Sequence, residues 1–132
     1  MKTRSIWANL VSSDLERTAA FYTALGFKRN DNGKNKEVVS FSFGQNNFVI
    51  NFFTAERLSM QMNGNLSLPK NSNEIIFSLS ADSKEELEDW AEKVKLANGN
   101  IFSEIQSFEK GYTFGFADPD HHKFNFLYWP GM

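Results

Sequence analysis

Cysteine is absent from this sequence. Its absence excludes disulfides, thiolate nucleophiles and cysteine-based metal sites, and it fits a reducing compartment, so we expect a cytoplasmic protein. Long apolar runs are missing too, because no segment approaches the roughly 18 apolar residues of a membrane-spanning helix. Residues 1–14 lack the apolar core of a signal peptide, and we therefore expect neither a targeting segment nor a membrane partner.

Neither sign of charge dominates, since 14 basic and 16 acidic residues leave a formal net charge of −2. The basic residues are scattered along the chain, which argues against a surface that follows phosphate groups, and we expect no nucleic-acid partner. Aromatic side chains, in contrast, are plentiful. The 14 phenylalanines raise the aromatic share to 15%, and such side chains can fill a sheet-based core or line a pocket.

The order of predicted elements repeats. Each half of the chain reads as a strand, a helix and three strands, which indicates two βαβββ modules from a duplicated unit. At 132 residues the chain is predicted to form a single domain with one core. We expect module one at residues 1–53, a connector at 54–73 and module two at 74–132.

Both predicted helices begin with a capping-box pattern, in which a serine is followed three residues later by a glutamate. The pattern predicts Ser13 as the N-cap of the first helix, with Glu16 as its partner. It predicts Ser83 as the N-cap of the second helix, with Glu86 in the same role. The connector has no clean period and is predicted to be an irregular segment with room for a short helical turn.

Motifs at opposite ends of the chain resemble a known superfamily. Residues 9–27, NLVSSDLERTAAFYTALGF, and residues 115–129, GFADPDHHKFNFLYW, are similar to the first-module signature and the closing hairpin of the vicinal oxygen chelate superfamily. This superfamily includes glyoxalase I, extradiol dioxygenases and the bleomycin- and fosfomycin-resistance proteins. SLSADSKEELEDWAEK and the closing YW look closest to small bacterial predicted lactoylglutathione lyases. The resemblance implies an α+β fold whose two βαβββ modules form a curved eight-stranded cleft, usually completed by a homodimer.

The resemblance also implies where a metal ion would bind. Enzymes of the superfamily hold one divalent ion with an inward-facing ligand on each of four strands, typically His, Gln or Glu. The matching positions here are Trp7, Asn51, Ile76 (Phe77 if the register slips by one) and Asn125. Divalent ions prefer imidazole and carboxylate ligands, which these side chains do not supply. We therefore expect no metal ligand and no cofactor, although a one-residue slip would turn each side chain to the other face.

Both histidines lie in the stretch DPDHHKFNF at 118–126. With its neighbouring aspartates, this stretch could form either a metal site or a turn. If the backbone is extended there, His121 and His122 point to opposite faces and cannot share an ion. Asp118 and Pro119 suit the first two positions of a type I turn, and His121 takes the place usually held by glycine. The stretch is predicted to be a turn, with a positive φ at His121.

Strand alternation predicts that the cleft is lined by aromatic side chains and amides rather than by charges. Two interpretations stay open: a real pocket, or aromatics that fill the space a substrate occupies in other members. The candidate ligand-binding residues are Trp7, Asn9, Asn51, Phe53, Asn125 and Trp129, with Leu127 beside them.

We therefore expect a binding protein for a small, largely uncharged or aromatic molecule. The alternative is a metalloenzyme, lactoylglutathione-lyase-like or dioxygenase-like, with a metal geometry that the resemblance does not reveal. A third possibility is a dimeric structural remnant with a closed cleft. The sequence names no catalytic residue, and whether the protein is an enzyme stays open.

Overall fold

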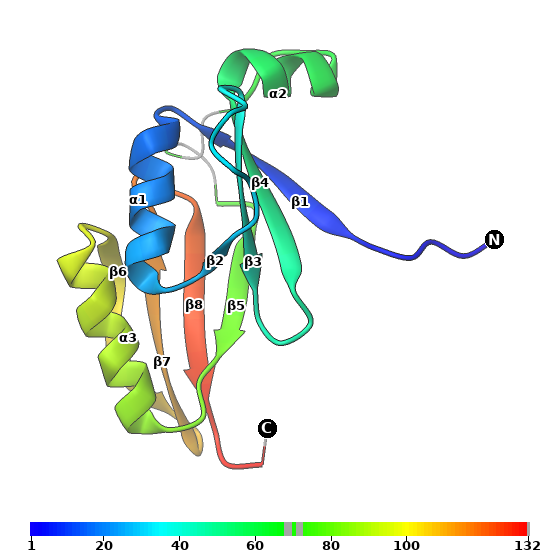
Figure 1. Cartoon of the computed structure of the whole chain (residues 1–132). Helices are drawn as coiled ribbons and strands as arrows, with labels where there is room; N and C mark the ends of the chain where they lie inside the picture. Colours follow the sequence, from blue (N-terminus) through cyan, green and yellow to red (C-terminus); the bar gives the residue numbers. More distant parts are fainter. Residues whose placement is uncertain (68–69, 71–72, 132) are drawn as a thin grey trace. The chain divides into compact units, whose positions relative to one another are not determined.

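The computed structural model of the chain describes residues 1–67, 70 and 73–131 (Figure 1). The chain divides into two compact units, residues 1–67 and 68–132. The boundary falls inside the connector predicted at 54–73, of which positions 68–69 and 71–72 lie outside the described residues. None of the described helices is long and apolar enough to cross a membrane.

The first unit is a four-stranded sheet with a helix packed on one face, and it follows the predicted βαβββ order. Its strand order is β1-β4-β3-β2, in which β1 and β4 are parallel and the other neighbours are antiparallel. Helix α1 contacts β2, β3 and β4 (Figure 1). The elements are β1 (Trp7–Ser12), α1 (Leu15–Leu25), β2 (Lys28–Arg29), β3 (Val38–Phe43), β4 (Phe48–Thr54) and α2 (Ala55–Met62).

The second unit repeats this plan, with strand order β5-β8-β7-β6 and a parallel pair formed by β5 and β8. Helix α3 contacts β6, β7 and β8. The predicted α+β class, with eight strands in two βαβββ modules, is confirmed. The elements are β5 (Ile76–Ser80), α3 (Lys84–Leu96), β6 (Asn100–Phe108), β7 (Gly111–Ala117) and β8 (Lys123–Tyr128).

The core of the first unit lies between α1 and its sheet. Tyr22 of α1 is fully buried, stacks on Phe52 at a ring-centroid distance of 4.8 Å, and contacts Phe41 at 5.5 Å and Phe43 at 5.7 Å. Because side chains alternate along a strand, the residues between these phenylalanines point to the opposite, open face. Each buried ring contributes roughly 1.5–3 kcal/mol by leaving water, so the packing of α1 decides which sheet face stays open.

The core of the second unit is a run of phenylalanines on β7 and β8. Phe116 stacks on Phe124 at 5.2 Å, Phe114 stacks on Phe126 at 5.5 Å, and Trp90 of α3 covers Phe126 at 4.6 Å. The four phenylalanine rings lie on the side of the sheet that α3 covers. Much of the phenylalanine content is therefore core filling.

The helix starts agree with the sequence in one module and differ in the other. Ser83 caps α3 as predicted, since its hydroxyl accepts the Glu86 N–H at 3.0 Å. The prediction of Ser13 as the cap of α1 is wrong by one residue, because the Asp14 carboxylate accepts the Arg17 N–H at 3.1 Å. Aspartate caps as well as serine does, so adjacent Ser and Asp residues leave the sequence pattern ambiguous.

The connector contains a full helix instead of the short helical turn that was predicted. Helix α2 follows β4 directly, and Thr54 at the end of that strand caps it by accepting the Arg57 N–H at 3.3 Å. Asn63 ends the helix in the left-handed conformation, with φ of 53°. Of the α2 side chains only Leu58 is buried, which explains why no clear apolar period marks this helix in the sequence.

The predicted turn at 118–121 is confirmed. The Asp118 carbonyl accepts the His121 N–H at 2.9 Å, and His121 has a φ of 70°. The buried Asp118 carboxylate accepts the backbone N–H groups of Asp120 and His122 at 2.9 Å each. The aspartate thus serves the backbone of the turn.

Replacing Asp118 with alanine is expected to lower the free energy of unfolding by about 1–3 kcal/mol, because buried N–H groups lose a charged acceptor. Urea unfolding of the Asp118→Ala variant measures the loss. Asp89→Ala, at an exposed position of α3, is the matched control and should change stability by less than about 0.5 kcal/mol. Equal effects of the two substitutions would contradict the role assigned to the Asp118 carboxylate.

Candidate functional site

The open face of the first sheet carries four of the predicted ligand-binding residues. Trp7 and Asn9 lie on β1, and Asn51 and Phe53 lie on β4, on the sheet face opposite the buried Ile50 and Phe52. Asn9 and Asn51 are direct partners in the parallel pairing, and the Asn51 side-chain amide donates to the Asn9 side-chain oxygen at 3.3 Å. Trp7 is 55% exposed. This face therefore offers an indole surface beside a pair of coupled amides.

The open face of the second sheet carries Asn125 at its centre. Asn125 of β8 pairs with Ser78 of β5 on one side and with Gly115 of β7 on the other. The side-chain oxygen of Asn125 is buried and has no hydrogen-bond partner among the described residues. A buried acceptor of this kind favours contact with an external donor, because leaving it unpaired costs about 1–3 kcal/mol.

A phenyl ring from β6 lies beside this amide. A Cβ atom placed on Gly115 would come within 2.6 Å of the Phe102 ring, so only glycine at 115 lets Phe102 lie across β7. The Lys123 ammonium sits 5.0 Å from the centroid of the same ring, within the range of a cation–π contact. Phe102 remains 42% exposed. Sequence reasoning missed this residue, and the small residue opposite it was the signal available.

The structure settles the register that the sequence left open on β5. Ile76 pairs with Lys123 and is exposed, on the same face as Ser78. Phe77 points to the helix-covered side, where its ring lies 5.4 Å from that of Phe124. Ile76, and not Phe77, therefore occupies the open face of the second sheet.

Trp129 lies just past the end of β8, next to the turn between β6 and β7. Its ring makes an edge-on contact with Phe108 at 6.2 Å. Together with Glu109 and Lys110 these two rings line a pocket of about 590 Å³. The structure thus places the predicted residue Trp129 in an aromatic pocket of its own within the second unit.

The four positions that the resemblance implies for a metal ion carry neither a carboxylate nor an imidazole. Trp7 and Ile76 have no donor oxygen or imidazole, and Asn51 and Asn125 offer only neutral amides, whereas divalent ions in proteins prefer carboxylate or imidazole ligands. In the described part of the chain, no three His, Cys, Asp or Glu residues are grouped so that they could hold a metal ion.

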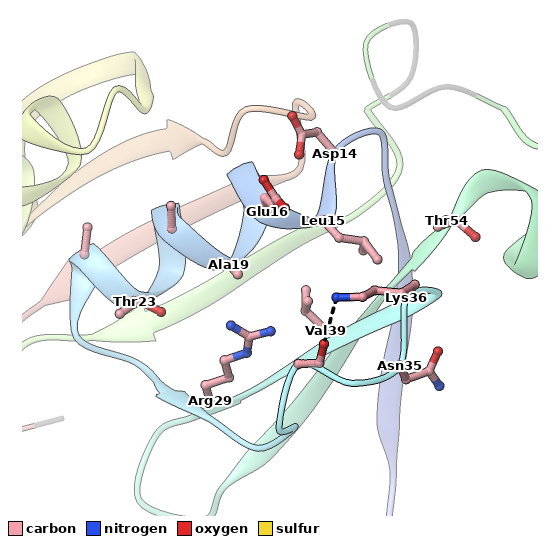
Figure 2. Close-up of a pocket in the computed structure, with 13 residues that line it drawn as sticks. Asp14, Leu15, Glu16, Ala19, Thr23, Arg29, Asn35, Lys36, Val39 and Thr54 are labelled. Atoms are coloured by element: carbon pink, nitrogen blue, oxygen red, sulfur yellow. Dashed lines mark hydrogen bonds between the residues drawn. The ribbon is translucent and has the colours of Figure 1, made fainter.

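A larger pocket, of about 750 Å³, lies in the first unit between α1 and the segment that leads from β2 into β3 (Figure 2). Sequence reasoning missed this pocket, because the cavity depends on how the segment packs against α1. Its wall includes Arg29, Gly33 and Lys36.

Asp31 holds this segment in shape. Burial alone would raise the pKa of its carboxyl group, but hydrogen bonds from the Arg29 side chain and from the backbone N–H groups of Ser40 and Gly33 lower the pKa to about 2. The Arg29 guanidinium binds both carboxylate oxygens, at 3.0 and 2.9 Å. Asp31 therefore stays ionised and keeps Arg29 in place.

Comparison with known families supports the resemblance. Residues 4–126 match the model of the Glyoxalase/Bleomycin resistance protein/Dioxygenase superfamily. No curated protein matches the sequence.

Solved structures agree. A hypothetical protein from S. aureus is 33% identical and superposes with a TM-score of 0.84, over 96% of this chain and 94% of that one. A glyoxalase-related enzyme from Fulvimarina pelagi is 18% identical, with a TM-score of 0.82, over 97% and 90% of the two chains. A lactoylglutathione lyase from Agrobacterium tumefaciens is 17% identical, with a TM-score of 0.66, over 96% and 95%. The last two likenesses show the fold alone.

The Asp31→Asn variant is expected to be less stable than the natural protein by about 1–2 kcal/mol at neutral pH. Because the folded pKa of Asp31, about 2, lies below its ordinary value of 3.8, the stabilisation is present in full above about pH 5 and is lost as the pH falls through 3.8 toward 2. Urea unfolding at neutral pH and near pH 3 should show the stability difference shrinking in acid. A constant difference, or the same loss in the exposed Asp89→Asn control, would refute this assignment.

Proposed function

Because the chain belongs to the Glyoxalase/Bleomycin resistance protein/Dioxygenase superfamily, we propose that it binds a small, largely uncharged or aromatic molecule on an open sheet face, without a divalent metal ion. The observation that carries this proposal is the chemistry of the four positions where relatives hold metal ligands. Two are neutral amides, Asn51 and Asn125, and two are apolar, Trp7 and Ile76. Such a surface suits stacking and neutral hydrogen bonds.

Each side chain has a defined part in the proposed binding. Trp7 presents an exposed indole face on which a planar group can stack. The hydrogen bond between Asn51 and Asn9 fixes the orientation of the Asn51 amide before a ligand arrives, which lowers the entropy cost of binding. The buried side-chain oxygen of Asn125 is a ready acceptor for an N–H or O–H group.

A second candidate is a metalloenzyme, because similar folds include a protein described as a glyoxalase-related enzyme and one described as a lactoylglutathione lyase. The fold alone does not carry their chemistry to this chain, since one fold can host unrelated reactions. A homodimer and a cytoplasmic location stay predictions, drawn from the family resemblance and the lack of cysteine. Light scattering of the purified protein tests the first of these.

Metal analysis separates the two candidates. Protein is purified without chelator, incubated with zinc and nickel, and then dialysed against metal-free buffer. It should retain much less than one ion per chain, because neutral amides do not offset the dehydration of a divalent cation. Mass spectrometry of the acid-digested protein gives the ratio. A value near one ion per chain that resists dialysis would overturn the metal-free proposal and favour the enzyme.

In a screen of neutral aromatic metabolites, a ligand is expected to raise the melting temperature. A ligand at 100 times its dissociation constant adds about 2.7 kcal/mol to the free energy of unfolding. Trp7→Ala should weaken binding about tenfold or more by removing the stacking surface. Ile6→Ala, at the neighbouring and more exposed position, is the matched control and should bind normally. If no compound shifts the melting temperature, the binding proposal fails.

A further inference from the structure

The pocket beside α1 lies on the helix-covered side of the first sheet, away from Trp7 and Asn51. Val39 in its wall belongs to the same strand face as Phe41 and Phe43, whose rings contact Tyr22 of α1. All the residues that line it come from the first unit. It is therefore a separate site, and nothing in the proposed function uses it.

Two cations gather at one end of this pocket, around Gly33. The Arg29 guanidinium lies 3.6 Å from the position that a Cβ atom on Gly33 would take, and the Lys36 ammonium donates to the Gly33 carbonyl at 3.3 Å. Figure 2 shows both side chains directed into the space between α1 and β3. Their charges are held close together before any ligand arrives.

The anion nearest to these cations is already engaged. Asp31 accepts hydrogen bonds from Arg29, Gly33 and Ser40, so it cannot turn to pair with Lys36 without breaking the loop. Lys36 forms no ion pair within the described part of the chain. Of the two cations, Arg29 has a carboxylate partner in Asp31 and Lys36 bonds to a backbone carbonyl. Guanidinium and ammonium groups both favour an oxyanion partner.

The rest of the pocket is mostly apolar and shallow-walled. Helix α1 contributes Ala19, Ala20 and Ala24, whose short side chains leave room, and β3 contributes Val39. Asp14 and Glu16 also line the pocket and would repel a second negative charge. The lining therefore selects an apolar body with a single anionic group.

We propose that this pocket binds a small organic carboxylate, with the carboxylate between Arg29 and Lys36 and the apolar body against Val39 and the alanines of α1. The volume of about 750 Å³ accommodates a molecule of metabolite size. A doubly charged phosphate ester fits less well, because Asp14 and Glu16 oppose its extra charge.

Nuclear magnetic resonance titration with benzoate, and with the neutral isostere benzamide, tests the proposal. Benzoate should shift the backbone amides of Thr23, Gly33 and Lys36 saturably at millimolar concentrations, and benzamide should not. Lys36→Gln should weaken benzoate binding about tenfold, which is the effect of losing one charge-assisted hydrogen bond. Lys34→Gln, in the same loop but outside the pocket, is the matched control and should bind as the natural protein does.

A blocking variant tests the location without changing charge. Ala24→Leu keeps a strong helix former at an exposed position of α1 and fills the pocket, so it should abolish the benzoate shifts while leaving the melting temperature unchanged. Equal responses to benzoate and benzamide, no saturable shift at all, or full binding by Lys36→Gln or Ala24→Leu would each overturn the proposal. Shifts confined to Trp7 and Asn51 would do the same, by placing the carboxylate on the open face instead.

Discussion

Tyr22 and the phenylalanines beneath it hold the first unit together, because the ring of Tyr22 has no exposed surface and contacts Phe41, Phe43 and Phe52. This packing seats α1 on one face of its sheet. The two-residue period of the strands then places every intervening side chain on the other face. The open amide-bearing surface and the pocket beside α1 are both consequences of that one contact.

Features that depend on local period or local hydrogen bonding were predictable from the sequence. The βαβββ order and the turn at 118–121 follow from alternation and turn chemistry, and alternation also places Trp7 and Asn51 on the sheet face opposite the buried phenylalanines. Other features depend on tertiary contacts that no local pattern records. Helix α2 has one buried side chain and no visible period, and the space beside Arg29 exists only because the 29–39 segment packs against α1.

The superfamily fold suggests a metal site, whereas the side chains at the positions implied for its ligands do not favour one. The family match covers residues 4–126, yet Asn51 and Asn125 supply neither a carboxylate nor an imidazole at the positions that the resemblance implies for metal ligands. An amide can donate and accept hydrogen bonds but is a weaker ligand for a divalent ion than a carboxylate or an imidazole. The same strands that position a metal in an enzyme can therefore position a recognition surface instead.

Gly115 of β7 and Phe102 of β6 together shape the open face of the second sheet. Because the Phe102 ring occupies the space of a side chain at 115, β6 and not β7 supplies the bulk beside Asn125. A larger residue at 115 would displace the partly exposed Phe102 ring, and a smaller one at 102 would leave the glycine open to solvent. The shape of this surface therefore depends on the two residues together.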